Sequence, residues 1–287
     1  MGTPSTLLSV SIVLYRSDPV VLRATLGSLA RAVEFLAGGP APGRPGTCGA
    51  AAALYLIDND SAHAAHRLVA DPELAPLFAC FDSVRVLDGH GNIGYGRAHN
   101  LVLPQLDSRY HLILNPDVVL ARESLRRALE YLDSHPEFGL LTPRVTDPAG
   151  HLQFLCRRYP SLLDLLVRGF LPRRWRAPFA TRLARYEMRD LIGVVEVVPN
   201  PPIVSGCFMF VRTELLRDLG GFDPRYFLYF EDYDLSIRAA SQSALVYVPS
   251  VEIEHGPGGA AIKGWHHIRL FLVSAFRFFS SHGWRVF

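Results

Sequence analysis

The alternation of short apolar runs with helical segments in the first half of the chain constrains the fold more than any other feature. Ser9–Tyr15 (SVSIVLY) is rich in β-branched residues, which is typical of a buried parallel strand. Asp18 and Pro19 follow as the cap and first turn of a helix. The same pattern predicts strands at Ala53–Ile57, Val84–Leu87 and His111–Leu114, and helices at Ala98–Leu103 and Arg122–Ser134. This order predicts an α/β fold with a mostly parallel central sheet flanked by helices.

The second half of the chain is mixed, and no internal repeat divides it. The predicted elements are a strand at Ile203–Val211, a helix from about Glu231, short strands at Leu245–Val248 and Glu252–His255, and a helix within Gly264–Trp284. The glycine- and proline-rich segment Gly38–Gly49 predicts a loop. A single mixed α/β domain fits this pattern best.

Composition excludes several classes of protein. With 287 residues, of which 49% are hydrophobic, the chain can bury a core without disulfides or a structural metal. A net charge of +2 argues against a protein built to hold nucleic acid. The four cysteines form no CxxC pair, so we expect reduced thiols in a cytoplasmic protein. We identify neither a signal peptide nor an apolar run long enough to cross a membrane, which leaves a soluble or membrane-surface protein.

Polar or glycine-rich residues end three of the predicted strands, as expected for a nucleotide site at the carboxyl edge of a parallel sheet. Gly89, Gly91 and Gly94 match G-x-G-x-x-G after a strand and before a helix, and Asp117 lies about twenty residues further on. The match follows the third strand rather than the first. A tight turn without a ligand therefore remains an alternative to a dinucleotide site.

Two further positions suggest a metal site. Asn115-Pro116-Asp117 ends an apolar strand, and one carboxylate can hold Mg²⁺ or Mn²⁺ if phosphate and water complete the coordination. Alternatively, Asp117 caps the next turn. His255 precedes a glycine-rich segment and is either a ligand of metal or phosphate or a structural histidine.

The densest cluster of acids lies in a run of aromatic residues from Gly220 to Leu235. Glu231, Asp232 and Asp234 fall within four positions. Acids at the start of a helix are stabilised by its dipole, so a capping role is one interpretation. An acid surrounded by Phe and Tyr also gains a raised pKa, which suits a general base. We favour the functional interpretation.

These motifs, in this order, resemble the inverting nucleotide-sugar transferases of glycosyltransferase family 2, which have the GT-A fold, and most closely the bacterial rhamnosyltransferases. The resemblance extends from Ser9 to about His255. Its motifs are SVSIVLY, IDNDS (57–61), GNIGYGRAHN (91–100), LNPDV (114–118), SGCFMFVR (205–212), GGFDPRYFLYFEDYDLSIR (220–238) and His255. The resemblance implies a GT-A domain over 1–260, with a nucleotide-sugar half at about 1–120 and an acceptor and catalytic half at about 121–260. An aromatic, basic helix at 261–287 follows.

The resemblance also implies roles for individual residues. On the donor side these are Val13, Tyr15 and Asp58 around the nucleobase, and Asn92, Gly94 and Asn100 beside the diphosphate and sugar. Asn115 and Asp117 replace the usual Asp-x-Asp motif, so Asp117 would carry most of the metal ligation together with His255. Asp232 would be the catalytic base, paired with Glu231. The implied cofactor is Mg²⁺ or Mn²⁺.

The resemblance implies dTDP-β-L-rhamnose as the donor, supported by Cys156–Ser161 (CRRYPS), which is similar to the RRxPS segment of the rhamnosyltransferases. A UDP-sugar such as UDP-galactofuranose or a UDP-hexose remains an alternative, as does a non-catalytic glycan-binding module. A dinucleotide oxidoreductase, supported only by the glycine pattern, is the weakest alternative.

The implied acceptor is a lipid-linked or lipopolysaccharide glycan. Seven arginines lie between Arg168 and Arg189, with aromatic residues among them. This segment suits peripheral contact with an anionic membrane, on the inner face of the cell membrane, or a lipid-linked diphosphate; a solvated basic face is the alternative. The C-terminal helix would add to membrane contact, pack on the core, or form a homo-oligomer.

Overall fold

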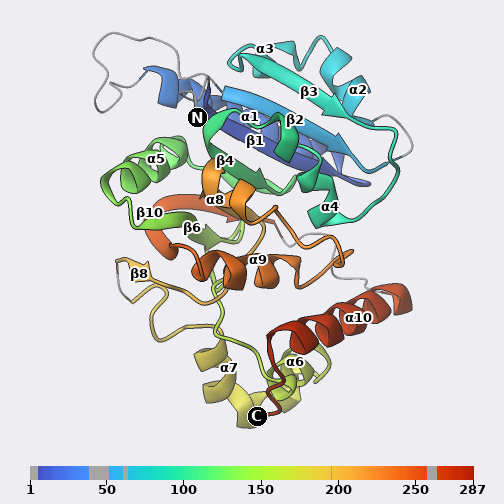
Figure 1. Cartoon of the computed structure of the whole chain (residues 1–287), viewed down its shortest axis with the longest axis vertical. Coiled ribbons are helices and arrows are strands. Elements are labelled where there is room, and N and C mark those ends of the chain that lie inside the picture. The colour runs from blue at the N-terminus through green and yellow to red at the C-terminus, as the bar shows by residue number, and fades with distance from the viewer. Residues whose placement is uncertain (1–5, 39–51, 61–63, 195, 257–263) are drawn as a thin grey trace.

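The computed structural model describes residues 6–38, 52–60, 64–194, 196–256 and 264–287 (Figure 1). One mixed sheet organises the molecule. Its strand order is β3 (Ser83–Leu87), β2 (Ala52–Asp58), β1 (Thr6–Leu14), β4 (Ser108–Leu114), β9 (Phe208–Arg212), β6 (Phe138–Thr146), β10 (Ala244–His255) and β5 (Val118–Leu120). Two short strands, β7 (Leu152–Gln153) and β8 (Val198–Pro199), pair with β6 and β10. The first four strands are parallel, whereas β9 runs antiparallel to β4 and β6.

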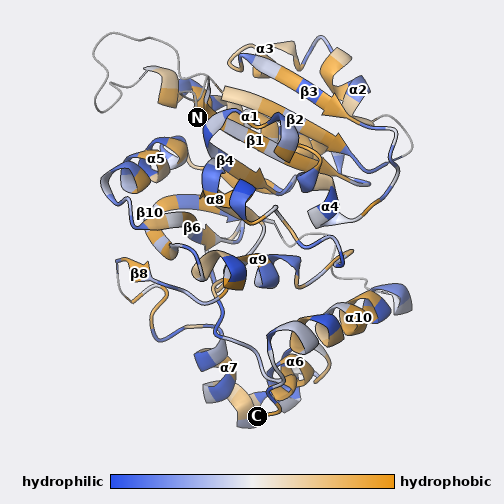
Figure 2. Cartoon of the chain, viewed as in Figure 1, coloured by the Kyte–Doolittle hydropathy of each residue, from blue (hydrophilic) through white to orange (hydrophobic). Residues whose placement is uncertain are grey.

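Helices cover both faces of this sheet, and the strands are its most hydrophobic elements (Figure 2). On one face α1 (Pro19–Gly38) and α5 (Ser124–Ser134) pack against alternate residues of β1, including Val10 and Ile12. On the other face lie α4 (Tyr95–Asn100), α8 (Thr213–Asp218) and α9 (Glu231–Ala240), against residues such as Val13. Burial on both faces explains why the strands are continuously apolar. Two short helices, α2 (Ala64–Ala70) and α3 (Ala75–Phe78), lie beside β2 and β3.

A third cluster joins the C-terminal helix to the rest of the chain. In α10 (Trp265–His282), Phe278 and Phe279 are fully buried against Leu165 of α6 (Leu162–Gly169) and against Tyr226 and Phe230. The side chain of His282 also lies 2.8 Å from Asp234 of α9. The predicted C-terminal helix is therefore confirmed, and the structure packs it on the core.

The remaining lower part of the molecule is helical (Figure 1). It comprises α6, two 3₁₀ turns (Arg173–Trp175 and Ala177–Phe179) and α7 (Ala180–Tyr186). Ser161 and Asp164 form a reciprocal cap on α6, which fixes where the helix begins. Among the described residues, no helix combines the length and hydrophobicity needed to cross a membrane.

The strands predicted in the first half are confirmed as β1 to β4, and the helices as α1 and α5. The helix predicted at Ala98–Leu103 begins earlier, at Tyr95, because Gly94 has a φ of 92° and interrupts the preceding backbone. A 3₁₀ turn (Leu103–Gln105) follows it. The predicted Gly38–Gly49 loop lies outside the described residues, apart from Gly38 at the end of α1, and so does the boundary predicted at residues 260–261.

The strand predicted at Ile203–Val211 is wrong for residues 203–207. Ile203 makes an isolated bridge to Arg157, and β9 begins only at Phe208, after a turn at Gly206. The two short strands predicted near the C-terminus are one strand, β10, whose register shifts between Val248 and Glu252. Such an irregularity bends a strand without ending it.

Candidate active site

The ends of β1, β2 and β4 meet at one edge of the sheet, because these strands are parallel and in register. Leu14 pairs with Asp58, and Ile12 pairs with Leu114. Residues that follow the strands, including Tyr15, therefore gather along the same edge. This is where a doubly wound sheet binds its ligand.

Asp58 lies at this edge but is fully buried. One carboxylate oxygen accepts a hydrogen bond from the N–H of Asp60 at 2.9 Å, and the other from the N–H of Ala65 at 2.8 Å. The carboxylate therefore joins the end of β2 to the first turn of α2. Val13 is buried in the core on the α4 side, whereas Tyr15 is half-exposed at the strand end.

The glycine-rich turn docks against the loop that precedes α9. The N–H of Gly94 donates to Oδ1 of Asn92 at 3.1 Å, and the N–H of Tyr95 donates to the carbonyl of Phe227 at 3.0 Å. A Cβ on Gly94 would lie 2.3 Å from that carbonyl oxygen. Only glycine therefore allows this approach. Asn59, which sequence reasoning missed, also donates to the carbonyl of Gly94 at 3.2 Å.

Asn100 joins the same two segments at the other end of α4. Its amide donates to the carbonyl of Phe222 at 2.7 Å and accepts from the N–H of Phe222 at 2.8 Å. Both of its polar groups thus bind the backbone of the loop. The structure supports a role for Asn100 in building the site.

Asp117 and His255 are brought together by strand pairing. Val118 of β5 pairs with His255 of β10, and this register places Oδ1 of Asp117 3.4 Å from Nε2 of His255. That carboxylate oxygen is buried and accepts no hydrogen bond from any residue that the structure describes. The N–H of Asn115, at the end of β4, donates to the carbonyl of Cys207 and joins this corner to the Gly206 turn.

The acid pair begins α9 directly after two residues in left-handed conformation. Tyr229 and Phe230 have φ of 71° and 65°, which is unfavourable for non-glycine residues. Glu231 is buried, whereas Asp232 is partly exposed. Asp232 accepts hydrogen bonds from the N–H groups of Gly206 at 3.0 Å and Tyr233 at 2.9 Å. The helix start therefore presents Asp232 to solvent and encloses Glu231.

The two acids differ electrostatically. Burial, and then the charge of Asp232, raises the pKa of Glu231 to about 8, and its Oε2 has no hydrogen-bond partner. Burial also raises the pKa of Asp232, but its two backbone hydrogen bonds oppose that effect. Glu231 is therefore the more easily protonated acid of the pair, and Asp232 the more easily ionised one.

Tyr95 links the acid pair to Asp117. Its hydroxyl donates to the carbonyl of Gly206 at 2.7 Å. Burial raises the pKa of Tyr95 well above its usual value, and the charges of Glu231, Asp232 and Asp117 raise it further. All three acids thus act on one phenol, which indicates a single site. Tyr95 and Gly206 lie within the quoted motifs, but nothing in the sequence indicated their contact.

Asp234, the third acid of the cluster, has a different role. It is buried and binds Arg238 at 2.7 Å and His282 at 2.8 Å, which ties α10 to α9. The side chain of Asp234 therefore ties two helices together rather than capping one.

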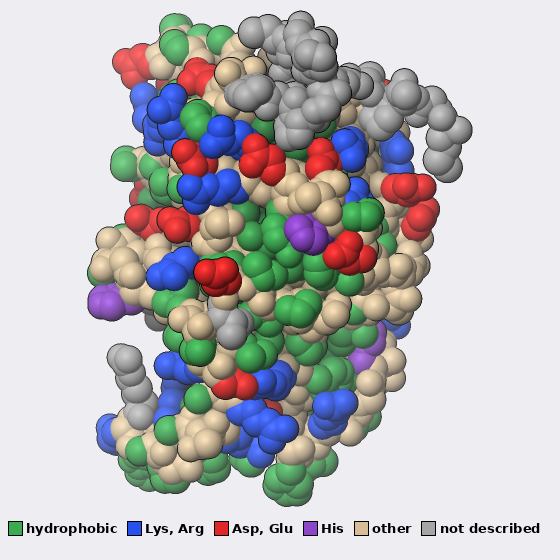
Figure 3. Space-filling model, turned by 90° about the vertical axis from the view of Figure 1, so that its left-hand side faces the viewer, with side chains coloured by type: hydrophobic (Ala, Val, Ile, Leu, Met, Phe, Trp, Pro, Cys, Tyr) green, Lys and Arg blue, Asp and Glu red, His purple; other side chains and the backbone are tan. Residues whose placement is uncertain are grey.

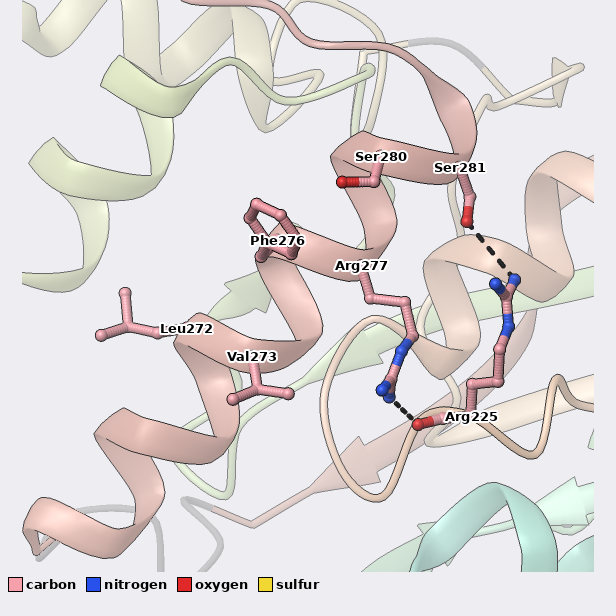
Figure 4. A pocket seen from close by; sticks show the side chains of 7 residues that line it. All are labelled: Arg225, Leu272, Val273, Phe276, Arg277, Ser280 and Ser281. Atoms are coloured by element: carbon pink, nitrogen blue, oxygen red, sulfur yellow. Dashed lines mark hydrogen bonds between the residues drawn. The ribbon is translucent and has the colours of Figure 1, made fainter.

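Two pockets lie near this region. One, of about 220 Å³, includes Asp232 and opens between α6, α9 and α10. The other, of about 540 Å³, is a groove on the outer face of α10 between Phe276, Arg277 and Arg225 (Figure 4). Only the first contains the candidate catalytic acids.

The family and fold follow from comparison with known proteins. Residues 79–261, more than half of the chain, match the family described as Glycosyltransferase like family 2. The N-acetylglucosaminyl-diphospho-decaprenol L-rhamnosyltransferase of Mycobacterium tuberculosis (strain ATCC 25618 / H37Rv) is 30% identical over 226 residues, covering 71% of this chain and 70% of that protein. Rhamnosyltransferase WbbL of Escherichia coli (strain K12) is 26% identical over 199 residues, covering 65% and 67%.

Solved structures show the same fold. GalNAc-T7 with UDP, GalNAc and Mn²⁺ has a TM-score of 0.58 at 16% identity, over 92% of this chain and 47% of that one, so the chain spans about half its length. TarS 1–349 of S. aureus in complex with UDP-GlcNAc has a TM-score of 0.55 at 15% identity, over 96% and 67%. The predicted fold and family are confirmed. The chain belongs to glycosyltransferase family 2, has the GT-A fold, and is a glycosyltransferase.

Proposed function

We propose that the chain is an inverting, metal-dependent rhamnosyltransferase that moves L-rhamnose from dTDP-β-L-rhamnose to a hydroxyl of a lipid-linked or lipopolysaccharide glycan. The observation that carries this proposal is the acid pair, in which a partly exposed Asp232 lies beside Glu231, whose burial raises its pKa. The names of the two relatives, both rhamnosyltransferases, support the choice of sugar.

Asp232 would act as the general base. It takes the proton of the acceptor hydroxyl while that oxygen attacks the anomeric carbon. The new bond joins the acceptor oxygen to the sugar, and the bond between the sugar and the diphosphate breaks, so that dTDP leaves with the electron pair. Attack opposite the leaving group converts the β-linked donor into an α-linked product. The N–H groups of Gly206 and Tyr233 hold the carboxylate in place for this step.

Asp117 and His255 fit a divalent cation that the donor helps to bind. The unpartnered Oδ1 of Asp117 and the nearby imidazole supply two ligands. No group of three or more potential His, Cys, Asp or Glu ligands occurs among the described residues, so phosphate and water would supply the rest. When bound, Mg²⁺ or Mn²⁺ would neutralise charge on the departing diphosphate.

The strand-end edge would hold the nucleotide. Tyr15, half-exposed at the end of β1, would lie against the base, with Val13 behind it and Asp58 holding the adjacent loop. The other proposed donor residues lie in or beside the glycine-rich turn and at the end of β4: Asn92, Gly94, Asn100 and Asn115.

We also propose that the enzyme works in the cytoplasm, on the inner face of the cell membrane. The outer face of α10 exposes Trp265, Leu272 and Phe276, and the arginines Arg269 and Arg277 lie on the same helix. Apolar side chains among cations suit an anionic lipid surface. Co-sedimentation with phosphatidylglycerol vesicles, but not with phosphatidylcholine vesicles, is expected. If the protein sediments with neither kind of vesicle, the result contradicts membrane contact.

Turnover on a panel of nucleotide sugars tests the proposed function. We expect transfer from dTDP-rhamnose to a farnesyl-diphospho-N-acetylglucosamine acceptor, with an α-linked product by NMR. If transfer occurs only from UDP-galactofuranose or a UDP-hexose, the proposed donor is wrong and the proposed mechanism is unchanged. Binding of donors without any transfer to a range of acceptors would favour a non-catalytic glycan-binding protein.

A further inference from the structure

A chain of hydroxyl and imidazole groups runs through the core between the sheet and α4. Charged side chains are spread over the outside of the molecule, as the face in Figure 3 shows. In β1, by contrast, the polar residues Ser9 and Ser11 are buried. They face the same apolar cluster as Val13, because alternate residues of a strand share a face. His111 of β4, which pairs with Ser9, and His99 of α4 are buried there too.

Hydrogen bonds join these side chains into one network. Oγ of Ser9 lies 2.6 Å from Oγ of Ser108 and 2.7 Å from Nδ1 of His111. Oγ of Ser11 lies 2.8 Å from Nε2 of His111 and 2.7 Å from Nδ1 of His99. Polar groups are costly in an apolar core unless they are hydrogen-bonded, so each member of the network depends on the next.

Ser11 couples the two rings, because both histidines are neutral. Burial lowers the pKa of His111 to about 3, and burial, followed by the charge of His111, lowers the pKa of His99 well below its usual value. The single hydrogen of the Ser11 hydroxyl can go to only one imidazole, so the other imidazole donates to Ser11. Nε2 of His99 has no hydrogen-bond partner among the described residues. The network therefore ends at His99, and Ser11 is the link that joins this ring to the sheet.

His99 connects the network to the candidate active site. Its ring lies 4.5 Å from that of Tyr95, one turn earlier in α4, and 5.8 Å from that of Phe222, between centroids. The hydroxyl of Tyr95 donates to the carbonyl of Gly206 at 2.7 Å, and the N–H of Gly206 donates to Asp232 at 3.0 Å. A helix of six residues has little stability of its own, so contacts of this kind decide where α4 lies.

We propose that His99 is a positioning residue for the base. Its hydrogen bond to Ser11 holds α4 against the sheet, and its ring holds Tyr95. Tyr95 in turn holds the Gly206 turn, whose N–H orients Asp232. The inference rests on the proposed role of Asp232 as the base. A histidine that only fills the core would affect folding and leave turnover unchanged.

Four variants of the full chain test this role. His99→Leu and Ser11→Ala each remove the hydrogen bond between α4 and β1. His99→Asn restores a polar group near the place of Nδ1. Ser108→Ala is the matched control, because it removes a buried hydroxyl from the other end of the network. Turnover is measured with the donor and acceptor that the nucleotide-sugar panel identifies, at a temperature where circular dichroism shows every variant to be folded.

We expect His99→Leu and Ser11→Ala to lower kcat by about 10-fold, because a misplaced base reacts poorly. The KM for the donor should change by less than about twofold, since both ends of α4 keep their own hydrogen bonds to the loop before α9. His99→Asn should recover most of the lost kcat. Ser108→Ala should lower the melting temperature and keep the wild-type kcat. An equal loss of kcat in Ser108→Ala would overturn the positioning role.

Hydrogen exchange gives a second measurement that does not depend on turnover. The N–H of Gly206 should exchange faster in His99→Leu than in Ser108→Ala, and equal exchange would overturn the inference. Faster exchange with a wild-type kcat would also overturn it, and Asp232→Asn then shows whether the base assignment fails as well. If no donor supports turnover by the wild type, the proposed function fails, and exchange alone decides whether His99 holds the Gly206 turn.

Discussion

Polar side chains make different contacts in two regions: the strand-end edge, where β1, β2 and β4 end, and the helical region of α6, α7 and α10. At the edge, Asp58 and Asn100 bind backbone groups through both of their polar ends. Over residues 157–190, which include α6 and α7, arginines outnumber acids, and the buried Arg157 has no carboxylate within 4 Å in the part of the chain that the structure describes. The difference shows that polar side chains at the strand-end edge are satisfied by the backbone of the fold, whereas residues 157–190 carry more positive charge than their own acids balance.

Replacing the base should have the largest effect. Asp232→Asn removes the proton acceptor and should lower kcat by about 10²–10⁴-fold. Binding of dTDP should hardly change, because the substitution preserves the shape of the helix start. The measurement is steady-state turnover with calorimetry of dTDP in parallel. Asp218→Asn, an exposed acid at the end of α8, should keep full activity, and near-normal turnover by Asp232→Asn would refute the assignment.

The glycine-rich turn tests whether the edge depends on close backbone packing. Gly94→Ala places a Cβ 2.3 Å from the carbonyl oxygen of Phe227 and should cost about 3 kcal/mol of stability. Gly89→Ala is the matched control, because its φ is also positive but no atom lies within 4 Å of the added Cβ. It should cost only about 1 kcal/mol. The measurement is the free energy of unfolding from urea denaturation. Equal losses of this free energy in the two variants would show that the close approach of Gly94 to Phe227 does not contribute to stability.

The raised pKa of Glu231 predicts a pH dependence of stability. Below about pH 4.5 this group is protonated in both the folded and the unfolded chain, so its burial carries no ionic penalty. As the pH rises towards about 8, the unfolded chain loses the proton while the folded chain retains it. The free energy of unfolding of wild type should therefore fall by roughly 5 kcal/mol relative to Glu231→Gln across this window. A constant difference between the two proteins would contradict the buried protonated acid.

A smaller effect is expected from the ion pair that anchors the helical region. Arg182 donates to Asp164 at 2.7 Å and to the hydroxyl of Ser161 at 2.8 Å, beside the cap of α6. Arg182→Gln should cost about 1 kcal/mol, because the pair is partly exposed. Hydrogen exchange should increase in α6 while dTDP affinity stays constant. Weaker dTDP binding would show that the two regions are coupled.

Sequence patterns predicted the strand-end edge well, because the apolar strands end abruptly there. Asp117 and Asp232 stood out as acids directly after or within apolar surroundings. The resemblance implied that Asp117 and His255 lie together, and the pairing of β5 with β10 is what brings them within 3.4 Å. The turn at Gly206 was missed because the apolar residues on both sides of it match the pattern of one continuous strand. The burial of Arg157, a residue quoted only as part of CRRYPS, was not predicted, and it follows from the packing around Tyr186.

Binding of dTDP and UDP to the wild-type chain, each with and without Mg²⁺, tests the central claim most directly. Calorimetry should show tight binding of dTDP that requires the metal, and Asp117→Asn should lose about 10-fold or more of that affinity. Metal-independent binding, or equal affinity in Asp117→Asn, would contradict a donor site completed by Asp117 and His255. Preference for UDP would contradict the rhamnosyl donor.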